Sequence, residues 1–468
     1  MVGLTVGTGM AHDPTLGGLT LPDILRQPRA ELRALQDRLL ARTVEMAYDN
    51  HPFYGALMRR EGLAPRHIRT CDDLVRLPPT SKTDFLADPE AFRLREDGLP
   101  AQETALQKVI YTTGTTSGRP APVYVTTFDS LLYMFDASRR TDFYDLGPGD
   151  LIANLFPLAP YPLGAYSRAI DEAAACGAAI LYCHTGRFET PFPAHNSLDK
   201  AVELVARHGA TVLWGVASFV RRVLVRAEET GADFSRVRMA MITGEASSGA
   251  LRDDIRRRLV AFGCAEPKVV NRYGSTEQGS SMVECREGSG FHSLAPDHLF
   301  HEVVDPATGT RLGDGEPGQL AFTHLLRRGT LFLRYLVGDH VTLSNAPCPH
   351  CGRTAPRITS QPVRTGDILK VKGTLVNFQL VKDKLERLPA VEEYQIVIRP
   401  ADVTDEFSMD ELVIRVAARP EHRGELERRI REEIGGSIQV TPAVEFASSD
   451  AIYDPLLTAK PRRVVDLR

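Results

Sequence analysis

The stretch from Thr211 to Thr243, TVLWGVASFVRRVLVRAEETGADFSRVRMAMIT, decides the fold class. It contains two apolar runs, at 211–214 and 239–243, that are typical of buried strands. The segment between them, at 218–229, has apolar residues at helical spacing. A strand, a helix and a second strand in this order form a crossover unit around a sheet. The stretch therefore predicts an α/β protein.

The same alternation extends to both sides of this stretch. Strands are expected at 151–156, at 179–183 and from Val269, and helices at 166–175, at 198–208 after the capping residue Ser197, and at 251–262. The N-terminal part is predicted to be helical, and strands are expected at 300–304, 319–324 and 331–335. These patterns predict a large N-terminal domain, residues 1–365, of mixed parallel sheets wrapped by helices, with a β-rich subdomain at about 285–360.

Residues 366–468 are predicted to form a small, mobile α+β domain. Their order is strand, helix, strand, strand, helix, strand, which is a β-α-β-β-α-β unit. The strands are expected at 369–372, 391–398, 411–416 and 444–446, and the helices at 380–387 and 421–434. The basic tail, 457–468, is expected to belong to neither core.

Length and composition exclude several classes of protein. The chain has 468 residues and a formal net charge of -4, so a broad electrostatic attraction to nucleic acid or to an anionic membrane is not expected. It contains no run of about 18 apolar residues that would cross a membrane. Residues 1–11 lack the pattern of a signal peptide, and seven cysteines are an odd number. We therefore expect a cytoplasmic protein with reduced thiols.

A loop rich in threonine and glycine, YTTGTTSGRP at 111–120, follows a predicted strand. Its hydroxyls and backbone N–H groups could wrap a phosphate, although such stretches are also common as solvated turns. It is not a Walker A loop, because no Gly-Lys-Ser/Thr follows. The sequence GDGEPG at 313–318 matches G-x-G-x-x-G by letter, but a strand rather than a helix follows it, so we reject a dinucleotide site there.

A second loop, NRYGSTE at 271–277, follows the strand that begins near Val269. A carboxylate beside hydroxyls at the carboxyl end of a strand can hold Mg²⁺. Asp339, in the segment RYLVGD, could accept hydrogen bonds from ribose hydroxyls. Taken singly, either acid could equally be an exposed turn residue.

In this order, five motifs resemble the adenylate-forming superfamily of acyl-CoA synthetases, luciferases and adenylation domains, and most closely the phenylacetate–CoA ligase family. They are the loop at 113–120, the loop at 273–277, Gly338-Asp339, RTGD at 364–367 and Lys460. Two further stretches, LPPTSK at 77–82 and KPRRVVD at 460–466, are also similar to that family. The resemblance covers almost the whole chain.

The resemblance implies a two-step reaction with ATP, Mg²⁺ and coenzyme A. The implied catalytic residues are Thr276, Glu277 as the Mg²⁺ ligand, and Lys460, which would meet the carboxylate in the first step. The implied nucleotide-binding residues are Thr113, Gly114, Thr115, Thr116, Ser117, Gly244, Glu245, Asn271, Arg272, Tyr273, Gly274, Asp339 and Arg364.

A structural zinc site is also expected. The C-x₂-C spacing of Cys348 and Cys351 lets two thiolates face one tetrahedral metal. Some relatives hold zinc in a similar arrangement, and we expect Cys285 and His292 to complete the site. Rival ligands are His298, His301 and His350.

The substrate is expected to be a small carboxylic acid with an aromatic ring. Flat apolar side chains suit such a ring, although aromatic residues are more often simply core. The pocket residues we expect are Phe156, Pro157, Tyr161, Trp214 and Phe219, with Arg168 or His184 as groups that could recognise a ring substituent.

Three functions remain open from the sequence. The first is an AMP-forming ligase that passes an aryl acid to coenzyme A. The second keeps the adenylation but uses an amine, a carrier-protein thiol or nitrite, as in diazotisation of an aryl amine in natural-product biosynthesis. The third is a nucleotide-binding scaffold without turnover. No nucleic-acid or membrane partner is expected, and relatives suggest a homodimer.

Overall fold

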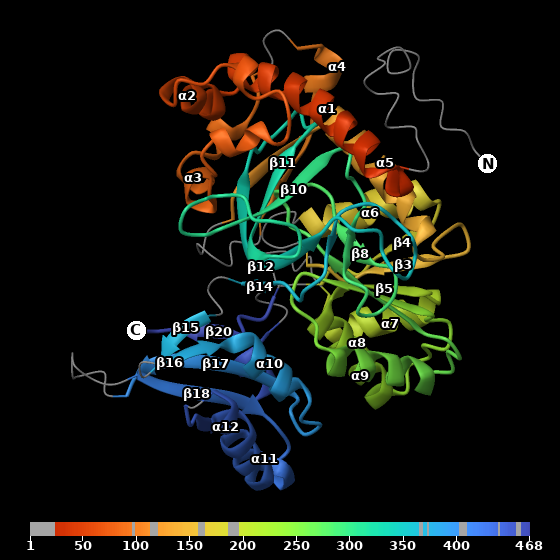
Figure 1. Cartoon of the computed structure of the whole chain (residues 1–468). Coiled ribbons are helices and arrows are strands. Elements are labelled where there is room, and N and C mark those ends of the chain that lie inside the picture. Colours follow the sequence, from red (N-terminus) through yellow and green to blue (C-terminus); the bar gives the residue numbers. More distant parts are fainter. Residues whose placement is uncertain are drawn as a thin grey trace, which may run out of the picture. The chain divides into compact units, whose positions relative to one another are not determined.

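The computed structural model describes residues 24–95, 99–112, 120–157, 164–185, 196–364, 368–371, 374–401, 410–438, 440–454 and 460–468 (Figure 1). The chain divides into two compact units. The first unit comprises residues 1–150, 161–180 and 270–362, and the second comprises 151–160, 181–269 and 363–468. Each unit contains helices and strands, as expected of an α/β protein.

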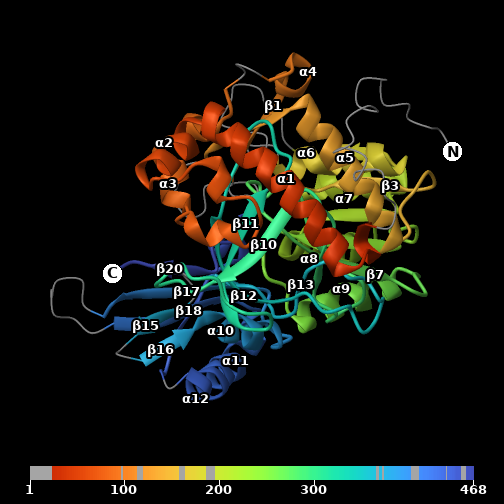
Figure 2. The same cartoon turned by 45° about the horizontal axis from the view of Figure 1, so that its top comes forward.

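The first unit begins with helices, as the sequence predicts. They are α1 (Arg29–Asn50), α2 (Pro52–Arg60), α3 (Lys82–Ala87), α4 (Ala101–Thr104), α5 (Thr127–Ser138) and α6 (Gly164–Cys176). Helix α1 buries Leu32, Leu35 and Leu39 on one face, at the spacing of an amphipathic helix. Helices α5 and α6 pack side by side (Figure 2).

The strands of the first unit are mostly antiparallel. They are the hairpin of β1 (Leu106–Tyr111) and β2 (Pro122–Thr126), and a larger sheet in the order β10 (Leu299–Val304), β11 (Pro317–His324), β12 (Tyr335–Ser344), β13 (Arg357–Ile358), β9 (Phe291–Ser293), β8 (Met282–Glu284) and β7 (Lys268–Tyr273). This is the β-rich region expected after residue 297. Helix α1 lies against the part of this sheet that β10 and β11 form, as Figure 1 shows.

The prediction of a strand at 331–335 was wrong, because strand β12 begins only at Tyr335. Arg334 has a left-handed backbone (φ 48°), which ends an extended run. Its buried guanidinium donates to Oε1 of Glu302 at 2.9 Å and to the carbonyl oxygen of Leu77 at 2.8 Å. These bonds hold the unusual turn, which the apolar pattern of the sequence could not reveal.

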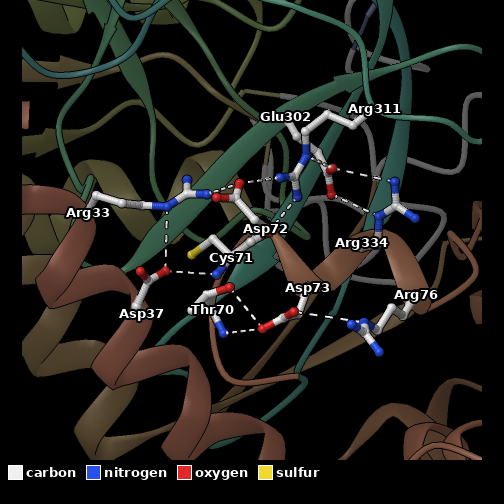
Figure 3. A network of polar contacts seen from close by, with 10 residues as sticks. All are labelled: Arg33, Asp37, Thr70, Cys71, Asp72, Asp73, Arg76, Glu302, Arg311 and Arg334. Carbon is white, nitrogen blue, oxygen red and sulfur yellow. Dashed lines mark hydrogen bonds and ion pairs between the residues drawn. The ribbon is translucent and has the colours of Figure 1, made fainter. Parts of the chain in front are cut away.

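Glu302 is also the centre of a wider polar network (Figure 3). It accepts a second hydrogen bond from Arg311, at 2.7 Å, and Arg311 in turn reaches Asp72 and the carbonyl oxygen of Cys71. Arg33 of α1 also pairs with Asp72. The network therefore ties helix α1 and the segment around Cys71 to strand β10.

The second unit contains the crossover strands that the opening stretch of sequence predicts. Strand β5 (Val212–Val216) pairs in parallel with β3 (Leu151–Asn154) and with β6 (Met239–Thr243), and β4 (Ala179–Tyr182) follows β3 in the sheet order. Helices α7 (Leu198–His208), α8 (Ala217–Thr230) and α9 (Gly249–Ala261) connect these strands. Ser197 caps α7 as expected, since its side chain accepts from the N–H of Lys200.

Residues 368–468 of this unit have a sheet and an apolar core of their own. The elements are β15 (Ile368–Val371), β16 (Thr374–Asn377), α10 (Phe378–Glu386), β17 (Glu393–Pro400), β18 (Asp410–Ala417), α11 (Arg423–Arg429), a π-helical turn (Ile430–Ile434), α12 (Gly435–Ile438), β19 (Ala443–Phe446), α13 (Ser449–Ile452) and β20 (Val464–Asp466). The four-stranded sheet has the order β19-β18-β17-β20. Side chains from α10, α11, β17 and β18 share the core. A domain division after residue 365 stays a prediction.

The prediction that the basic tail belongs to neither core was wrong for its last residues. Strand β20 pairs in parallel with β17, with Ile396 opposite Val464 and Ile398 opposite Asp466. The side chain of Val464 packs on the apolar core of this small sheet. The sequence did not predict this strand, because only two adjacent valines mark it within the basic tail.

None of the described helices combines the length and the hydropathy that a membrane span requires.

Candidate active site and metal centre

The end of strand β7 carries three of the predicted nucleotide-binding residues, Asn271, Arg272 and Tyr273. The phenol of Tyr273 donates a hydrogen bond of 2.6 Å to Oδ2 of Asp339 on β12. Asp339 follows Gly338, whose φ of 83° interrupts the regular strand where the pairing of β11 with β12 shifts register. The structure therefore brings together two residues that the sequence separates by 66 positions.

Gly274 follows Tyr273, and its lack of a side chain is required. A Cβ at this position would lie 2.9 Å from the carbonyl oxygen of Ser280, which is closer than side chains tolerate. The chain therefore folds back on itself directly after β7, and the loop from Ser275 to Glu277 is held in a tight turn. The hydroxyl of Ser275 accepts from the N–H of Gln278 at 3.1 Å and closes this turn.

Arg168 of helix α6 contacts the same loop and holds it in place. Its guanidinium donates to the carbonyl oxygens of Ser275 and Thr276, both at 2.9 Å. Burial lowers the pKa of Arg168 to about 10, which leaves the group charged at neutral pH. The expectation that Arg168 recognises a ring substituent stays untested, and the described contacts give it this second role. No sequence signal marked this contact, because α6 and the loop lie more than 100 residues apart.

Glu277, the predicted Mg²⁺ ligand, is largely buried, with 6 % of its surface exposed. Nζ of Lys82, at the start of α3, lies 3.4 Å from its Oε1. Lys82 belongs to the stretch LPPTSK, so the structure connects this motif to the Glu277 loop. A carboxylate that faces a cation in this way can also face a bound metal ion.

The side chain of Arg272 lies in a buried polar network beside β7. Its guanidinium bonds Glu172 at 3.2 Å and Ser281 at 2.9 Å, and all three side chains are buried. Arg140 also pairs with Glu172. The side chain of Arg272 therefore serves this internal network, and Asn271 beside it is buried as well.

In the second unit, two predicted residues lie at the end of β6 and one lies in the tail. Gly244 has a φ of 92°, and a Cβ there would lie 3.2 Å from Cε of Lys460. Oε1 of Glu245 accepts from the N–H of Ser218 at 2.6 Å, at the start of α8. The structure therefore brings Lys460 to the loop that was expected to line the adenine.

Several predicted residues are placed less informatively. Thr113, Gly114, Thr115, Thr116, Ser117 and Tyr161 lie outside the described residues. Arg364, on β14 (Val363–Arg364), is exposed. Phe156, Pro157, Trp214 and Phe219 are buried, and the rings of Phe156 and Trp214 meet at 6.1 Å in a T-shaped pair. These aromatic side chains are part of the core of the second unit.

The four predicted zinc ligands form one cluster in the first unit. The ligand atoms of Cys285, His292, Cys348 and Cys351 all lie within 4.8 Å of one another. Sγ of Cys285 is 4.0 Å from Sγ of Cys348, and Sγ of Cys351 is 3.5 Å from Nε2 of His292. A tetrahedral ion with Zn–S distances of about 2.3 Å needs ligand separations close to these.

The orientation of His292 also suits a metal. Its Nδ1 lies 3.2 Å from the carbonyl oxygen of Val283, which fixes the proton on Nδ1 and leaves the Nε2 lone pair toward the thiols. Burial lowers the pKa of His292 to about 4, so the ring is neutral.

The rival ligands lie elsewhere. His298 pairs with Asp136 at 2.9 Å, His301 contacts Gln278, and His350 is exposed beside Arg286.

Comparisons with known proteins match most of the chain. A family model described as AMP-binding enzyme matches residues 56–335. The chain is 28% identical to a phenylacetate-coenzyme A ligase of Thermus thermophilus, over 96% of this chain and 99% of that protein. It is 26% identical to the phenylacetate-coenzyme A ligase of Escherichia coli, over 94% and 95%. A solved 2-hydroxyisobutyryl-CoA ligase shares the fold, with a TM-score of 0.79 at 22% identity over 96% of this chain and 92% of that one.

Proposed function

The chain belongs to the family of AMP-binding enzymes, and on this premise we propose that it joins an aromatic carboxylic acid to coenzyme A. In the first step, a carboxylate oxygen attacks the α-phosphorus of ATP, the bond to the β-phosphate breaks, and pyrophosphate leaves. In the second step, the thiol of coenzyme A attacks the acyl carbon and AMP leaves. The phenylacetate-coenzyme A ligases among the relatives support this reaction and an aryl acid.

One observation carries the proposal, namely the hydrogen bond of 2.6 Å between Tyr273 and Asp339. It joins the end of β7, where the nucleotide-binding loop begins, to the acid expected to accept from the ribose hydroxyls. A carboxylate offers about four acceptor sites, so Asp339 can accept from a ribose hydroxyl while it accepts from Tyr273. Arg272, by contrast, acts in the proposal as a support of β7 rather than as a contact of the nucleotide.

Mg²⁺ fits the loop after β7. Glu277 offers hard oxygen ligands, and Thr276 and Ser275 offer hydroxyls nearby in sequence, which is the donor set that Mg²⁺ prefers. When bound, the ion would neutralise phosphate charge. Arg168 keeps the carbonyl oxygens of Ser275 and Thr276 in place, so the direction of Glu277 is fixed before ATP arrives.

Lys460 is the proposed cation for the adenylation step. Negative charge builds on the oxygens around the α-phosphorus in the transition state, and a fixed ammonium stabilises that charge. Its contact with Gly244 supports this role, since Gly244 and Glu245 are the proposed adenine loop. The phosphate loop, Thr113 to Ser117, would hold the β- and γ-phosphates.

Zn²⁺ is proposed at Cys285, His292, Cys348 and Cys351, with a structural role. Four protein ligands fill a tetrahedral ion, so no position stays open for a substrate. The cluster connects the short strands β8 and β9 to the turn at 348–351. In this position, a metal would hold these two short strands and the turn together.

The acceptor could also be an amine, a carrier thiol or nitrite, since nothing in the described site selects coenzyme A. A scaffold without turnover is the remaining alternative. A cytoplasmic location and a homodimer are part of the proposal on the grounds of sequence and relatives.

The test is ATP–pyrophosphate exchange on the whole protein with a panel of aryl acids, followed by product analysis with coenzyme A, an amine or nitrite. Exchange that depends on an aryl acid, with an acyl-CoA product, supports the proposal. Exchange without a thioester would favour another acceptor. Binding of ATP without exchange for any acid would favour the scaffold.

A further inference from the structure

A group of buried polar side chains lies directly behind the Glu277 loop and is not used in the proposed reaction. Gln278 and Ser280 follow Glu277 in sequence, and His301 of β10 and Arg327 after β11 join them. All four residues have 8 % or less of their surface exposed. Among the residues that the structure describes, Oε1 of Gln278, Oγ of Ser280, Nδ1 of His301, and Nε and Nη2 of Arg327 have no hydrogen-bond partner.

Gln278, His301 and Arg327 contact the same short stretch of chain, in which Ser280 is the next residue. Nε2 of Gln278 lies 2.7 Å from Nε2 of His301. A Cβ at Gly279 would lie 2.7 Å from Nη1 of Arg327, so the guanidinium packs directly on the backbone between Gln278 and Ser280. His324 donates to the carbonyl oxygen of Gln278 at 3.2 Å and fixes this stretch of chain. The orphaned atoms of Gln278, His301 and Arg327 therefore lie around one stretch of backbone, with Ser280 next to it in sequence.

The site contains mainly hydrogen-bond donors. The amide nitrogen of Gln278 donates to Nε2 of His301, and burial lowers the pKa of that ring to about 4. A neutral ring that accepts at Nε2 carries its proton on Nδ1, so Nδ1 is a donor. Together with the two nitrogens of Arg327 and the hydroxyl of Ser280, the unpaired groups therefore include at least three donor groups. Oε1 of Gln278 is the unpaired acceptor among them.

Arg327 has one charged partner among the described residues, Asp129, at a distance that is long for a hydrogen bond. Arg327 and Arg168 are close enough to repel each other, and this repulsion adds to burial in lowering the pKa of Arg168. The carboxylate of Asp129 lies 3.5 Å from Nε of Arg327, but it already accepts from the backbone N–H groups of Gly329 and Thr126. Buried donors without partners are costly, so a ligand that supplies acceptors would be strongly favoured.

We propose that the acid activated by this chain carries, besides its reacting carboxyl, a second group with hydrogen-bond acceptors that binds Arg327, Ser280 and His301. This inference rests on the proposed function and specifies its substrate class. Gln278 follows Glu277 directly in the sequence, so the proposed site adjoins the loop of the reaction centre. A ring hydroxyl and a second carboxylate share the required chemistry.

The test is ATP–pyrophosphate exchange on the whole protein with benzoate, 3- and 4-hydroxybenzoate, isophthalate and terephthalate. We expect kcat/KM for the best substituted acid to exceed that for benzoate by about 10-fold or more, because an unfilled polar site penalises the analogue that lacks the group. The hydroxybenzoates and the dicarboxylates distinguish a neutral from an anionic group. Arg327→Met should reduce this preference by about 10-fold, and Ser280→Ala should reduce it by a smaller factor.

Arg328→Met is the matched control, since Arg328 is the buried neighbour of Arg327 but bonds Glu103 at 2.6 Å. It should leave the preference unchanged. Melting curves check that each variant is folded, and Ser280→Ala serves if Arg327→Met is not. Equal use of benzoate and the substituted acids, or a preference unchanged in both variants, overturns the inference and leaves ordered water in the site. Absence of exchange with every acid would instead refute the proposed function.

Discussion

The side chain of Lys460 fills the space that a Cβ on Gly244 would need, with Cε only 3.2 Å from that position. The side chain of Lys460, in the tail, therefore packs against Gly244 at the end of strand β6. If this lysine stabilises the adenylation transition state, Lys460→Ala should lower the rate of acyl-adenylate formation by about 100-fold or more.

The same variant should form thioester from a supplied acyl-adenylate at nearly the normal rate. Single-turnover measurements of the two half-reactions separate these outcomes. Lys200→Ala is a suitable control, because Lys200 is an exposed residue of α7 that pairs with Glu203. Equal losses in both half-reactions would contradict the role given to Lys460.

Tyr273→Phe should weaken nucleotide binding modestly. The substitution removes the donor that orients Asp339 but leaves the carboxylate itself. We expect KM for ATP to rise by about 3- to 10-fold with kcat little changed, since one hydrogen bond to a charged group is lost. Asp339→Asn should have the larger effect on KM. A Tyr273→Phe enzyme with unchanged KM and lower kcat would point to a different function of this pair.

Arg168→Gln should loosen the loop before Glu277. The glutamine side chain would have to take the place of the guanidinium, which donates two hydrogen bonds of 2.9 Å to the carbonyl oxygens of Ser275 and Thr276. We expect the half-saturating Mg²⁺ concentration in pyrophosphate exchange to rise by about 10-fold, because Glu277 is no longer held in position. Arg168→Lys should recover part of the affinity. If Mg²⁺ dependence stays the same while the melting temperature falls, Arg168 contributes only to stability.

Removal of zinc should destabilise the region around β8 and β9. We expect purified protein to contain about one zinc per chain and to lose melting temperature when a strong chelator removes it. Cys348→Ser should give the same low melting temperature without chelator, whereas Cys264→Ser, at a half-buried thiol outside the cluster, should not. Protein that holds no metal by elemental analysis, although purified without chelator, would refute the site.

Stability should fall as the pH decreases from 6.5 toward 4. Burial lowers the pKa of His51 to about 3 and that of His301 to about 4, compared with about 6.5 in the unfolded chain. Below pH 6.5 the unfolded chain takes up protons that the folded chain refuses, which favours unfolding. At pH 5 each such histidine costs about 2 kcal/mol. His298 has the opposite sign, because Asp136 and Asp297 outweigh burial and raise its pKa.

Urea midpoints at pH 7.5 and pH 5.0 provide the measurement. His51→Gln should be less stable than the parent at pH 7.5, since Nδ1 accepts from the N–H of Tyr54, but it should lose less stability between the two pH values. An equal loss in both proteins would show that His51 titrates normally in the folded state.

Local patterns predicted the fold where a segment is decided by its own residues. Ser197 and the apolar spacing after it fixed helix α7 at its true bounds, and the two runs of the opening stretch became β5 and β6. Prediction failed where contacts with residues far away in the sequence determine the local structure. Arg334 turns its backbone to reach Glu302, and the tail becomes strand β20 only through its pairing with β17.

In the candidate site, too, prediction succeeded for local patterns and failed for contacts between distant residues. The cysteines and His292 could be predicted as one cluster, since spacing and family resemblance both pointed to it. The contacts of Arg168 and Lys82 with the Glu277 loop could not be predicted, because their partners lie far away in the sequence. Arg327 was not singled out, because an isolated Arg in a sequence with 56 basic residues carries no signal of its own. Only the folded chain shows that Arg272 faces the interior while Arg168 holds the loop.

The pairing of the tail has a practical consequence for work with this protein. The N–H of Leu467 still donates to the carbonyl oxygen of Ile398 at 2.8 Å, and Arg468 bonds Asp410. A purification tag or fluorescent fusion attached after Arg468 would start at the last residue of a hydrogen-bonded ladder, eight positions from Lys460. A fusion at this end could therefore disturb the strand that follows Lys460.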